Sequence, residues 1–289
     1  MTLVSVERPT WSKSRVSALA ECRRKLRFST DKSLAADPDV QQLRKIKNRH
    51  LWVGGIVHDR IAEILKMVRQ GEAVPATDGF ILQTRERMRK EFKLSKENAD
   101  ASAGRLFEHV YDRQIEAAVW QRHWSSVEKS LHWFLASNWL KRFSALGPEC
   151  WKAVDEILDF DVNGIKAYVK IDCAIESGGK FFLMDWKTGA IRDEAADGLR
   201  VAALYAHEVW GADPEQIDAK AVSVIDGKTL SVPIDEEVLM ETHLKIEEES
   251  ARLEEEVSNA GELLKIPPPS SRMVCNSCSY QKLCFPKGM

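Results

Sequence analysis

Apolar residues recur at three- and four-residue spacings from residue 14 to about residue 150. Runs of β-branched residues are few in this stretch, so the pattern predicts helices. Near Asp155 the pattern changes to alternation, which is typical of half-buried strands. The predicted strands are Glu156–Val162, Ile165–Ile175 and Lys180–Trp186, with turns at Asn163-Gly164 and Ser177-Gly178-Gly179. The sequence therefore predicts a helical region followed by a three-stranded antiparallel meander.

The rest of the chain predicts two further helices and a second hairpin. The predicted elements are a helix over Glu194–Trp210 that ends at Gly211, a hairpin of Lys220–Ile225 and Thr229–Pro233, and an acidic helix over Glu236–Ala260. Three prolines make Ile266–Ser271 a stiff, extended linker. The predicted class is α/β or helix-rich α+β, with a sheet flanked by helices and a large N-terminal helical region.

Composition excludes several classes of protein. With 44% hydrophobic and 30% charged residues, the chain has the composition of an ordinary globular protein. Runs of eighteen or more apolar residues are absent, so no membrane span is expected. The N-terminal residues lack an apolar stretch followed by a small-residue cleavage site. We therefore expect a cytoplasmic protein without a membrane partner.

Charge is distributed unevenly along the chain. The net charge is only −2, but residues 1–50 hold twelve Lys and Arg against five Asp and Glu. Residues 235–265 hold eleven Asp and Glu against three Lys and Arg. A basic face can follow a phosphate backbone while an acidic face points elsewhere. Both segments are equally typical of solvated helix surfaces, and charge alone does not separate the two interpretations.

Three charged residues lie on the two strands that precede the Glu194–Trp210 helix. Asp172 lies on one strand, and Asp185 and Lys187 lie at the end of the next. Two carboxylates on adjacent strands can converge on one hard cation. Lys187 lies two residues after Asp185, so both side chains are on one face of the strand. This arrangement is typical of metal-assisted phosphodiester hydrolysis, although the same spacing also arises by chance.

These residues resemble the core motif of the PD-(D/E)XK nucleases. Asp172 followed by Asp185-Trp186-Lys187-Thr188-Gly189 matches that motif, with Ile171 where the name-giving proline would be. Upstream, Gly54-Gly55-Ile56-Val57-His58 resembles the Gly-x-x-x-His motif of the RecB-like branch. The resemblance implies Mg²⁺ or Mn²⁺ held by His58, Asp172 and Asp185, with Asp172, Asp185 and Lys187 as catalytic residues. It also implies a restriction-endonuclease-like core sheet.

Other positions of the motif match less completely. Glu156 matches an acidic position of this branch and is a candidate outer-shell metal ligand. Tyr205 matches the tyrosine of the branch's Gln-x-x-x-Tyr element, but Val201 stands where the glutamine would be. Candidate DNA contacts are Tyr205, Arg200, and Arg23 and Arg24 in the basic N-terminal segment.

Three of the six cysteines lie close together near the C-terminus, at Cys275, Cys278 and Cys284. Three thiolates are one short of the usual four for zinc or a [4Fe–4S] cluster. The segment around Cys22 resembles the N-terminal cysteine segment of the iron–sulfur nucleases of the RecB-like branch, which include the AddB nuclease domain and the CRISPR-associated exonuclease family. The resemblance implies that Cys22 completes a [4Fe–4S] site. A zinc knuckle and an incomplete trio are the alternatives.

The resemblance implies four segments along the chain. They are an N-terminal helical segment with the cluster cysteine and the Gly-x-x-x-His helix (1–70), a helical insertion or cap (71–150), the nuclease core (151–265), and the linker with the cysteine-rich tail (266–289). The expected function is an exonuclease on single-stranded DNA or DNA ends, in recombination, repair or CRISPR adaptation, with partners from those pathways. The alternatives are a non-cleaving DNA-end-binding scaffold and an RNA-directed nuclease.

Overall fold

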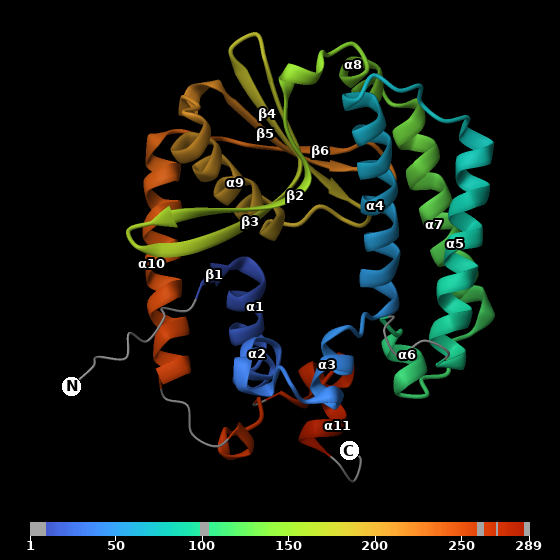
Figure 1. The fold of residues 1–289 in the computed structure, drawn as a ribbon, viewed down its shortest axis with the longest axis vertical. Helices are drawn as coiled ribbons and strands as arrows, with labels where there is room; N and C mark the ends of the chain where they lie inside the picture. Colours follow the sequence, from blue (N-terminus) through green and yellow to red (C-terminus); the bar gives the residue numbers. More distant parts are fainter. Residues whose placement is uncertain (1–9, 99–103, 259–262, 270, 286–289) are drawn as a thin grey trace. The chain divides into compact units, whose positions relative to one another are not determined.

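The computed structural model describes residues 10–98, 104–258, 263–269 and 271–285 (Figure 1). The chain divides into two compact units. The terminal unit takes residues 1–44, 158–169 and 240–289, and the sheet unit takes residues 45–157 and 170–239. The last two residues predicted for the acidic helix, Asn259 and Ala260, and Ser270 of the linker lie outside the described residues.

The first half of the sheet unit is helical, as predicted. Its helices are α4 (Arg49–Arg69), α5 (Thr77–Glu97), α6 (Phe107–Val110), α7 (Ala117–Ala136), α8 (Asn138–Phe143) and the short 3₁₀ helix η2 (Pro148–Cys150). The side chain of Asn48 caps α4 by accepting a 2.9 Å hydrogen bond from the Leu51 N–H. Lys66 and Arg69 lie in its last turn, where cations favour the helix dipole.

The long helices of the sheet unit share one apolar core. Figure 1 shows α4, α5 and α7 side by side, and α7 packs against both of the others. Ile61 and Leu65 of α4 and Leu131 and Phe134 of α7 are completely buried. Their spacing of three to four residues puts each pair on one helix face, which explains why the sequence periodicity predicts this packing.

The remaining elements of the sheet unit build a mixed sheet. They are β2 (Trp151–Val162), β3 (Ile165–Ser177), β4 (Lys180–Lys187), α9 (Glu194–Trp210), η3 (Pro214–Gln216), β5 (Ile217–Ser223) and β6 (Thr229–Val232). Strand β2 pairs with β3, and both strands continue into the terminal unit. Pairs β3–β4 and β5–β6 are antiparallel, whereas β4 and β5 are parallel.

The predicted hairpin turn and the helix after β4 are confirmed. Asn163 and Gly164 have φ values of 49° and 80°, and a two-residue hairpin turn of this kind needs φ above zero at both positions. Helix α9 spans Glu194–Trp210, as predicted, and Gly211 ends it at φ 69°. It connects the parallel strands β4 and β5 and packs against both. A connection between parallel strands needs a crossover of this length.

The terminal unit is built from an N-terminal segment and a C-terminal segment of the chain, with residues 158–169 between them in sequence. It contains β1 (Trp11–Ser12), α1 (Lys13–Glu21), α2 (Arg23–Thr30), η1 (Lys32–Leu34), α3 (Pro38–Arg44), most of α10 (Glu236–Ser258), η4 (Leu263–Lys265), η5 (Arg272–Ser277) and α11 (Gln281–Cys284). Trp11 pairs with Ala167 of β3 and donates a 3.0 Å hydrogen bond from Nε1 to Glu249 of α10. Phe28 of α2 stacks on Tyr280, with 5.1 Å between ring centroids.

The fold class is therefore helix-rich α+β, with a mixed central sheet flanked by helices, as the sequence predicts. Among the residues with described structure, no helix is both long enough and apolar enough to cross a membrane.

Candidate metal centre and cysteine pocket

His58 and Asp172 lie in contact in the sheet unit. Nδ1 of His58 is 3.2 Å from Oδ2 of Asp172. One turn before His58, Gly54 lies on the same face of α4, and a Cβ at Gly54 would be 3.4 Å from Oγ1 of Thr188. Thr188 directly follows β4, so this face of α4 meets the end of that strand. The Gly-x-x-x-His segment thus places His58 beside the strands that carry Asp172 and Asp185.

Asp172 is buried, with 8% of its surface exposed, and its carboxylate is well supported. The Trp186 N–H donates a 3.0 Å hydrogen bond to Oδ2, the same oxygen that faces His58. Burial raises the pKa of Asp172, but the hydrogen bond and positive charge of His58 outweigh burial, so the net pKa is lowered. Burial lowers the pKa of His58, and Asp172 more than reverses that effect, so its pKa is raised. In the metal-free protein the two side chains favour an imidazolium–carboxylate pair.

Asp185 and Lys187 form the second part of the centre at the end of β4. Nζ of Lys187 is 2.5 Å from Oδ2 of Asp185. Burial raises the pKa of Asp185, and the negative charge of Asp172 raises it further, against the opposing effect of Lys187. A buried carboxylate whose pKa is raised by a second carboxylate provides a favourable site for a cation.

The residues fit a divalent cation by their chemistry. Oδ2 of Asp185 is buried, and its contact with Nζ of Lys187 is an ion pair without hydrogen-bond geometry. Two carboxylates and an imidazole are ligands that Mg²⁺ or Mn²⁺ can use. Within the described ranges, no group of three or more His, Cys, Asp or Glu side chains is already gathered closely enough to ligate one ion.

Lys170 and Asp155 lie beside this centre, and sequence reasoning missed both. Nζ of Lys170 is 2.7 Å from Oδ1 of Asp155. The charges of Lys170 and Asp172 act on each other's pKa, and Lys170 also lowers that of His58. Lys170 lies two residues before Asp172 on β3, so the period of a strand puts both side chains on one face. That period could have identified Lys170.

Glu156 occupies a different environment from the candidate ligands. Its Oε1 accepts a 3.2 Å hydrogen bond from the Val154 N–H and lies 3.5 Å from NH1 of Arg69. Asp155, the residue before it, has φ 53° inside β2 and contacts Lys170 instead. A left-handed residue within a strand shifts the alternation by one position. On β2, Asp155 is thus the carboxylate that contacts Lys170, whereas Glu156 contacts Arg69.

The candidate DNA contacts are dispersed. Tyr205 is 6% exposed and packs edge-on against Trp210 at 5.1 Å between centroids, while NH1 of Arg200 lies 3.5 Å from Asp197. In the terminal unit, Nε of Arg23 is 2.5 Å from Oε2 of Glu256. Nε of Arg24 donates a 2.6 Å hydrogen bond to the Ile266 carbonyl. Arg23 and Arg24 thus stabilise the terminal unit itself.

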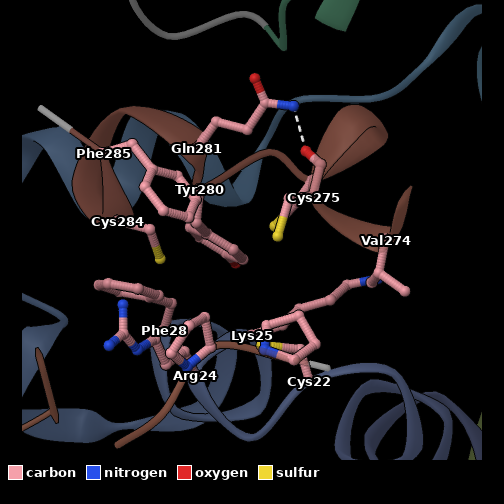
Figure 2. A pocket seen from close by; sticks show the side chains of 13 residues that line it. Cys22, Arg24, Lys25, Phe28, Val274, Cys275, Tyr280, Gln281, Cys284 and Phe285 are labelled. Carbon is pink, nitrogen blue, oxygen red and sulfur yellow. Dashed lines mark hydrogen bonds between the residues drawn. The ribbon is translucent and has the colours of Figure 1, made fainter. Parts of the chain in front are cut away.

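The four candidate cluster cysteines line a single pocket in the terminal unit. Cys22, Cys275, Cys278 and Cys284 all contribute to its wall. Figure 2 shows the sulfur atoms of Cys275 and Cys284 pointing toward the same space, with Cys22 on its far side. The side-chain amide of Gln281 donates to the Cys275 carbonyl, which holds the two C-terminal turns together. The remaining cysteines, Cys150 and Cys173, lie in the sheet unit.

The cysteine pocket fits a metal by its donor set. Four thiols around one space form the Cys₄ ligand set of both structural zinc and [4Fe–4S] sites. The four cysteines line a space of about 20 Å³, and in the described residues no three of their thiols are already close enough to ligate one ion. Burial raises the pKa of Cys278 to about 11 and also raises that of Cys284, against the effect of Arg24. Without metal the pocket therefore holds thiols, and metal binding releases protons.

Comparisons with known proteins address the family. The chain matches a solved structure titled "Crystal structure of SSO0001" at 11% identity and a TM-score of 0.30, over 71% of this chain and 98% of that one. A TM-score this low does not establish a common fold. A search of curated proteins finds no match. The family model of the PD-(D/E)XK nuclease superfamily matches residues 10–285, which include His58, Asp172, Asp185 and Lys187. The chain belongs to the PD-(D/E)XK nuclease superfamily.

Proposed function

We propose that this protein is a Mg²⁺- or Mn²⁺-dependent deoxyribonuclease of the RecB-like branch that acts on single-stranded DNA or DNA ends. The observation that carries the proposal is the contact of His58 with Asp172 beside Asp185 and Lys187. Members of the superfamily are usually metal-dependent nucleases, and the family match includes all four residues. A cytoplasmic location and an exonuclease role in recombination, repair or CRISPR adaptation, with partners from those pathways, belong to the proposal.

The residues of the centre have distinct roles in the proposed reaction. His58, Asp172 and Asp185 would hold the cation, which supplies a polarised phosphoryl oxygen and a water of lowered pKa when bound. The Trp186 N–H holds Oδ2 of Asp172 in place. Because a metal-ligating histidine must be neutral, cation binding there would release the proton that His58 holds beside Asp172. Lys187 lies at the end of β4 with 33% of its side chain exposed, where its ammonium group can orient water and stabilise charge that develops on the phosphate. Glu156 is at most an outer-shell group.

The four pocket cysteines hold a [4Fe–4S] cluster in this proposal. The cluster would connect Cys22 of the N-terminal helices with the C-terminal trio and so close a loop that spans most of the chain. Cross-links that close long loops remove the most entropy from the unfolded chain, roughly 4–5 kcal/mol in the disulfide model. None of the four thiols is among the candidate ligands of the cation, so the cluster is structural in this proposal.

Digestion of end-labelled DNA tests the proposed activity. Single-stranded DNA, blunt duplex DNA and RNA of one sequence are incubated with Mn²⁺ and either wild-type protein or Lys187→Ala. The expected result is a ladder of shortened single-stranded DNA with wild type, no product with Lys187→Ala, and intact RNA. DNA that is bound but left intact by wild type would favour the non-cleaving scaffold. RNA degraded faster than DNA would favour the RNA-directed nuclease.

A further inference from the structure

A cavity of about 290 Å³ lies in the sheet unit, and none of the candidate metal ligands lines it. Its walls come from Trp52 at the start of α4, from the second half of α5, and from the segments 45–47 and 104–106. The volume is close to the lower end of the range for small-molecule sites, about 300–1,000 Å³. The cavity is therefore of a size for a single small ligand and not for an extended strand.

Positive charge dominates the wall of this cavity. The cationic side chains are Lys45, Lys47, Arg87 and Arg105, and the one carboxylate among the lining residues is Glu91. Glu91 already accepts hydrogen bonds from Trp52 Nε1 at 2.6 Å and from Arg87 Nε at 2.8 Å. Arg87 also pairs with Asp59 at 2.5 Å, so its charge is offset and the excess comes from the other cations. Lys47 is exposed and makes no ion pair with any residue in the described part of the chain. A cavity with an excess of one charge concentrates ions of the opposite sign.

Backbone hydrogen bonds hold together the two segments that carry Lys45, Lys47 and Arg105. The Lys47 N–H donates to the Arg105 carbonyl at 3.1 Å, and the Phe107 N–H donates to the Lys47 carbonyl at 2.9 Å. Gly104 lies so close to the neighbouring segment that a Cβ would be 2.7 Å from the Lys45 carbonyl oxygen. Nε of Arg105 donates to the Ser95 carbonyl at 3.2 Å. The rim is thus built by backbone pairing, and the Arg105 guanidinium is oriented by its bond to Ser95.

The cavity also has an apolar wall. Trp52, Leu94 and Leu106 line it beside the cations. A ligand that matches both surfaces has an anionic group for the cations and a flat or apolar group for the tryptophan. A nucleotide has both, in its phosphate and its base. Trp52 and His58 lie on one helix about six residues, or roughly 9 Å, apart. Arg87 of the cavity wall also lies 2.5 Å from Asp59, the residue after His58, so one side of the cavity adjoins the region of the metal centre.

We propose that this cavity binds one nucleotide of single-stranded DNA, with its phosphate between Lys47 and Arg105 and its sugar and base along Trp52. The assignment of the nucleotide to a DNA strand rests on the proposed nuclease function. The cavity is a binding subsite: it fixes the strand a few nucleotides from the bond that is cut and takes no part in the chemistry.

Binding of a fluorescent fifteen-nucleotide single strand, measured by anisotropy in EDTA, tests this inference without cleavage. The variant Lys47→Gln/Arg105→Gln is compared with Arg89→Gln/Lys90→Gln, which removes the same charge from exposed positions of α5 outside the cavity. The cavity variant is expected to raise Kd about tenfold and to flatten the salt dependence by about 0.7 per lost contact. Unlabelled 5′-dAMP should compete with the strand in wild type and less in the cavity variant.

The outcomes separate this inference from the proposed function. If Arg105→Gln disturbs folding, the single variant Lys47→Gln replaces the pair, because Lys47 is exposed. It too is expected to raise the Kd for the single strand. Equal effects of the cavity and control pairs would overturn the inference while leaving the nuclease proposal intact. Competition by inorganic phosphate as strong as that by 5′-dAMP would overturn the nucleotide assignment. Wild-type protein that binds the strand through the cavity but does not cleave it would contradict the nuclease proposal alone. Wild-type protein that does not bind the strand would contradict both.

Discussion

Nδ1 of His58 lies 3.2 Å from Oδ2 of Asp172, and the Trp186 N–H donates to that same oxygen at 3.0 Å. One carboxylate thus connects α4, β3 and β4 at the place where Asp185 and Lys187 also lie. This contact links the Gly-x-x-x-His segment to the strand motif in space, and the first predictions follow from it.

The pH dependence of stability should reflect this pair in metal-free protein. The pKa of His58 is raised in the folded protein. The stability that the charged His58 contributes is therefore complete below the ordinary histidine pKa of 6.5 and is lost as pH rises through the folded-state pKa. The pKa of Asp172 is lowered, so its contribution is present above its ordinary value of 3.8 and is lost as pH falls. Asp172→Asn should therefore cost about 1–3 kcal/mol near pH 5.5 and less near pH 8.5.

Urea denaturation in EDTA at the two pH values measures that difference. The His58 ring titration followed by NMR provides the direct readout, and the pKa of His58 should fall in Asp172→Asn. Lys170→Gln is the matched change of opposite sign: it should raise the pKa of His58, because Lys170 lowers it. A His58 pKa that neither variant moves would mean that the pair does not form in solution.

Divalent metal should stabilise the protein through Asp185. A ligand that binds only the folded state adds about 2.7 kcal/mol at a concentration a hundred times its Kd. Mn²⁺ should therefore raise the melting temperature of wild type and leave that of Asp185→Ala unchanged. Glu156→Gln serves as the control, because Arg69 and the Val154 N–H engage that carboxylate. An equal loss of the Mn²⁺ effect in Glu156→Gln would place Glu156 among the direct ligands.

Loss of a pocket cysteine should remove the cluster before it affects the metal centre. Anaerobically purified protein should be brown, with broad absorption near about 400 nm and about four irons per chain. Cys278→Ala and Cys22→Ala should each bleach the protein and lower its melting temperature, whereas Cys150→Ala, outside the pocket, should do neither. Colourless protein with one zinc would establish the zinc knuckle instead. Full iron content in Cys22→Ala would place the fourth ligand elsewhere.

Arg24 and Arg23 should differ in their contribution to stability, although they are neighbours. Arg24 is 9% exposed and donates to the Ile266 carbonyl, so Arg24→Gln should lower the free energy of unfolding by about 1–3 kcal/mol. The Arg23–Glu256 pair has an arginine side chain that is 47% exposed, so Arg23→Gln should cost less than about 1 kcal/mol. Urea titration of the two variants measures the difference, and equal costs would contradict the buried position of Arg24.

The sheet and the helix after β4 could be predicted because local rules determine them. Alternation identifies β3, and an apolar run between two turns identifies β4. The Asn163-Gly164 pair identifies the turn between β2 and β3, and Gly211 ends α9. The place of Asp155 could not be predicted. Its φ of 53° interrupts the alternation of β2, so that both Ala153 and Val154 are completely buried. The sequence pattern does not predict that Asp155 takes a left-handed conformation inside a strand.

The two sites differ in how much the sequence reveals. Cys275, Cys278 and Cys284 are close in sequence, but spacing alone cannot bring Cys22 to them; packing of the terminal unit does. The cavity beside Trp52 was not predicted either, because its cations come from separate segments of the chain. The proposed division into segments 1–70, 71–150, 151–265 and 266–289 stays a prediction about the chain.

Cleavage by Asp185→Ala, with DNA binding measured on the same preparation, tests the central claim most directly. Asp185 supplies a ligand for the cation and lies outside the basic cavity, so the variant should bind single-stranded DNA with wild-type affinity in EDTA. In Mn²⁺ it should show no cleavage above background, while Asp218→Ala, an aspartate of β5 outside the centre, should cleave like wild type. Cleavage by Asp185→Ala at the wild-type rate would contradict the assignment of the metal centre.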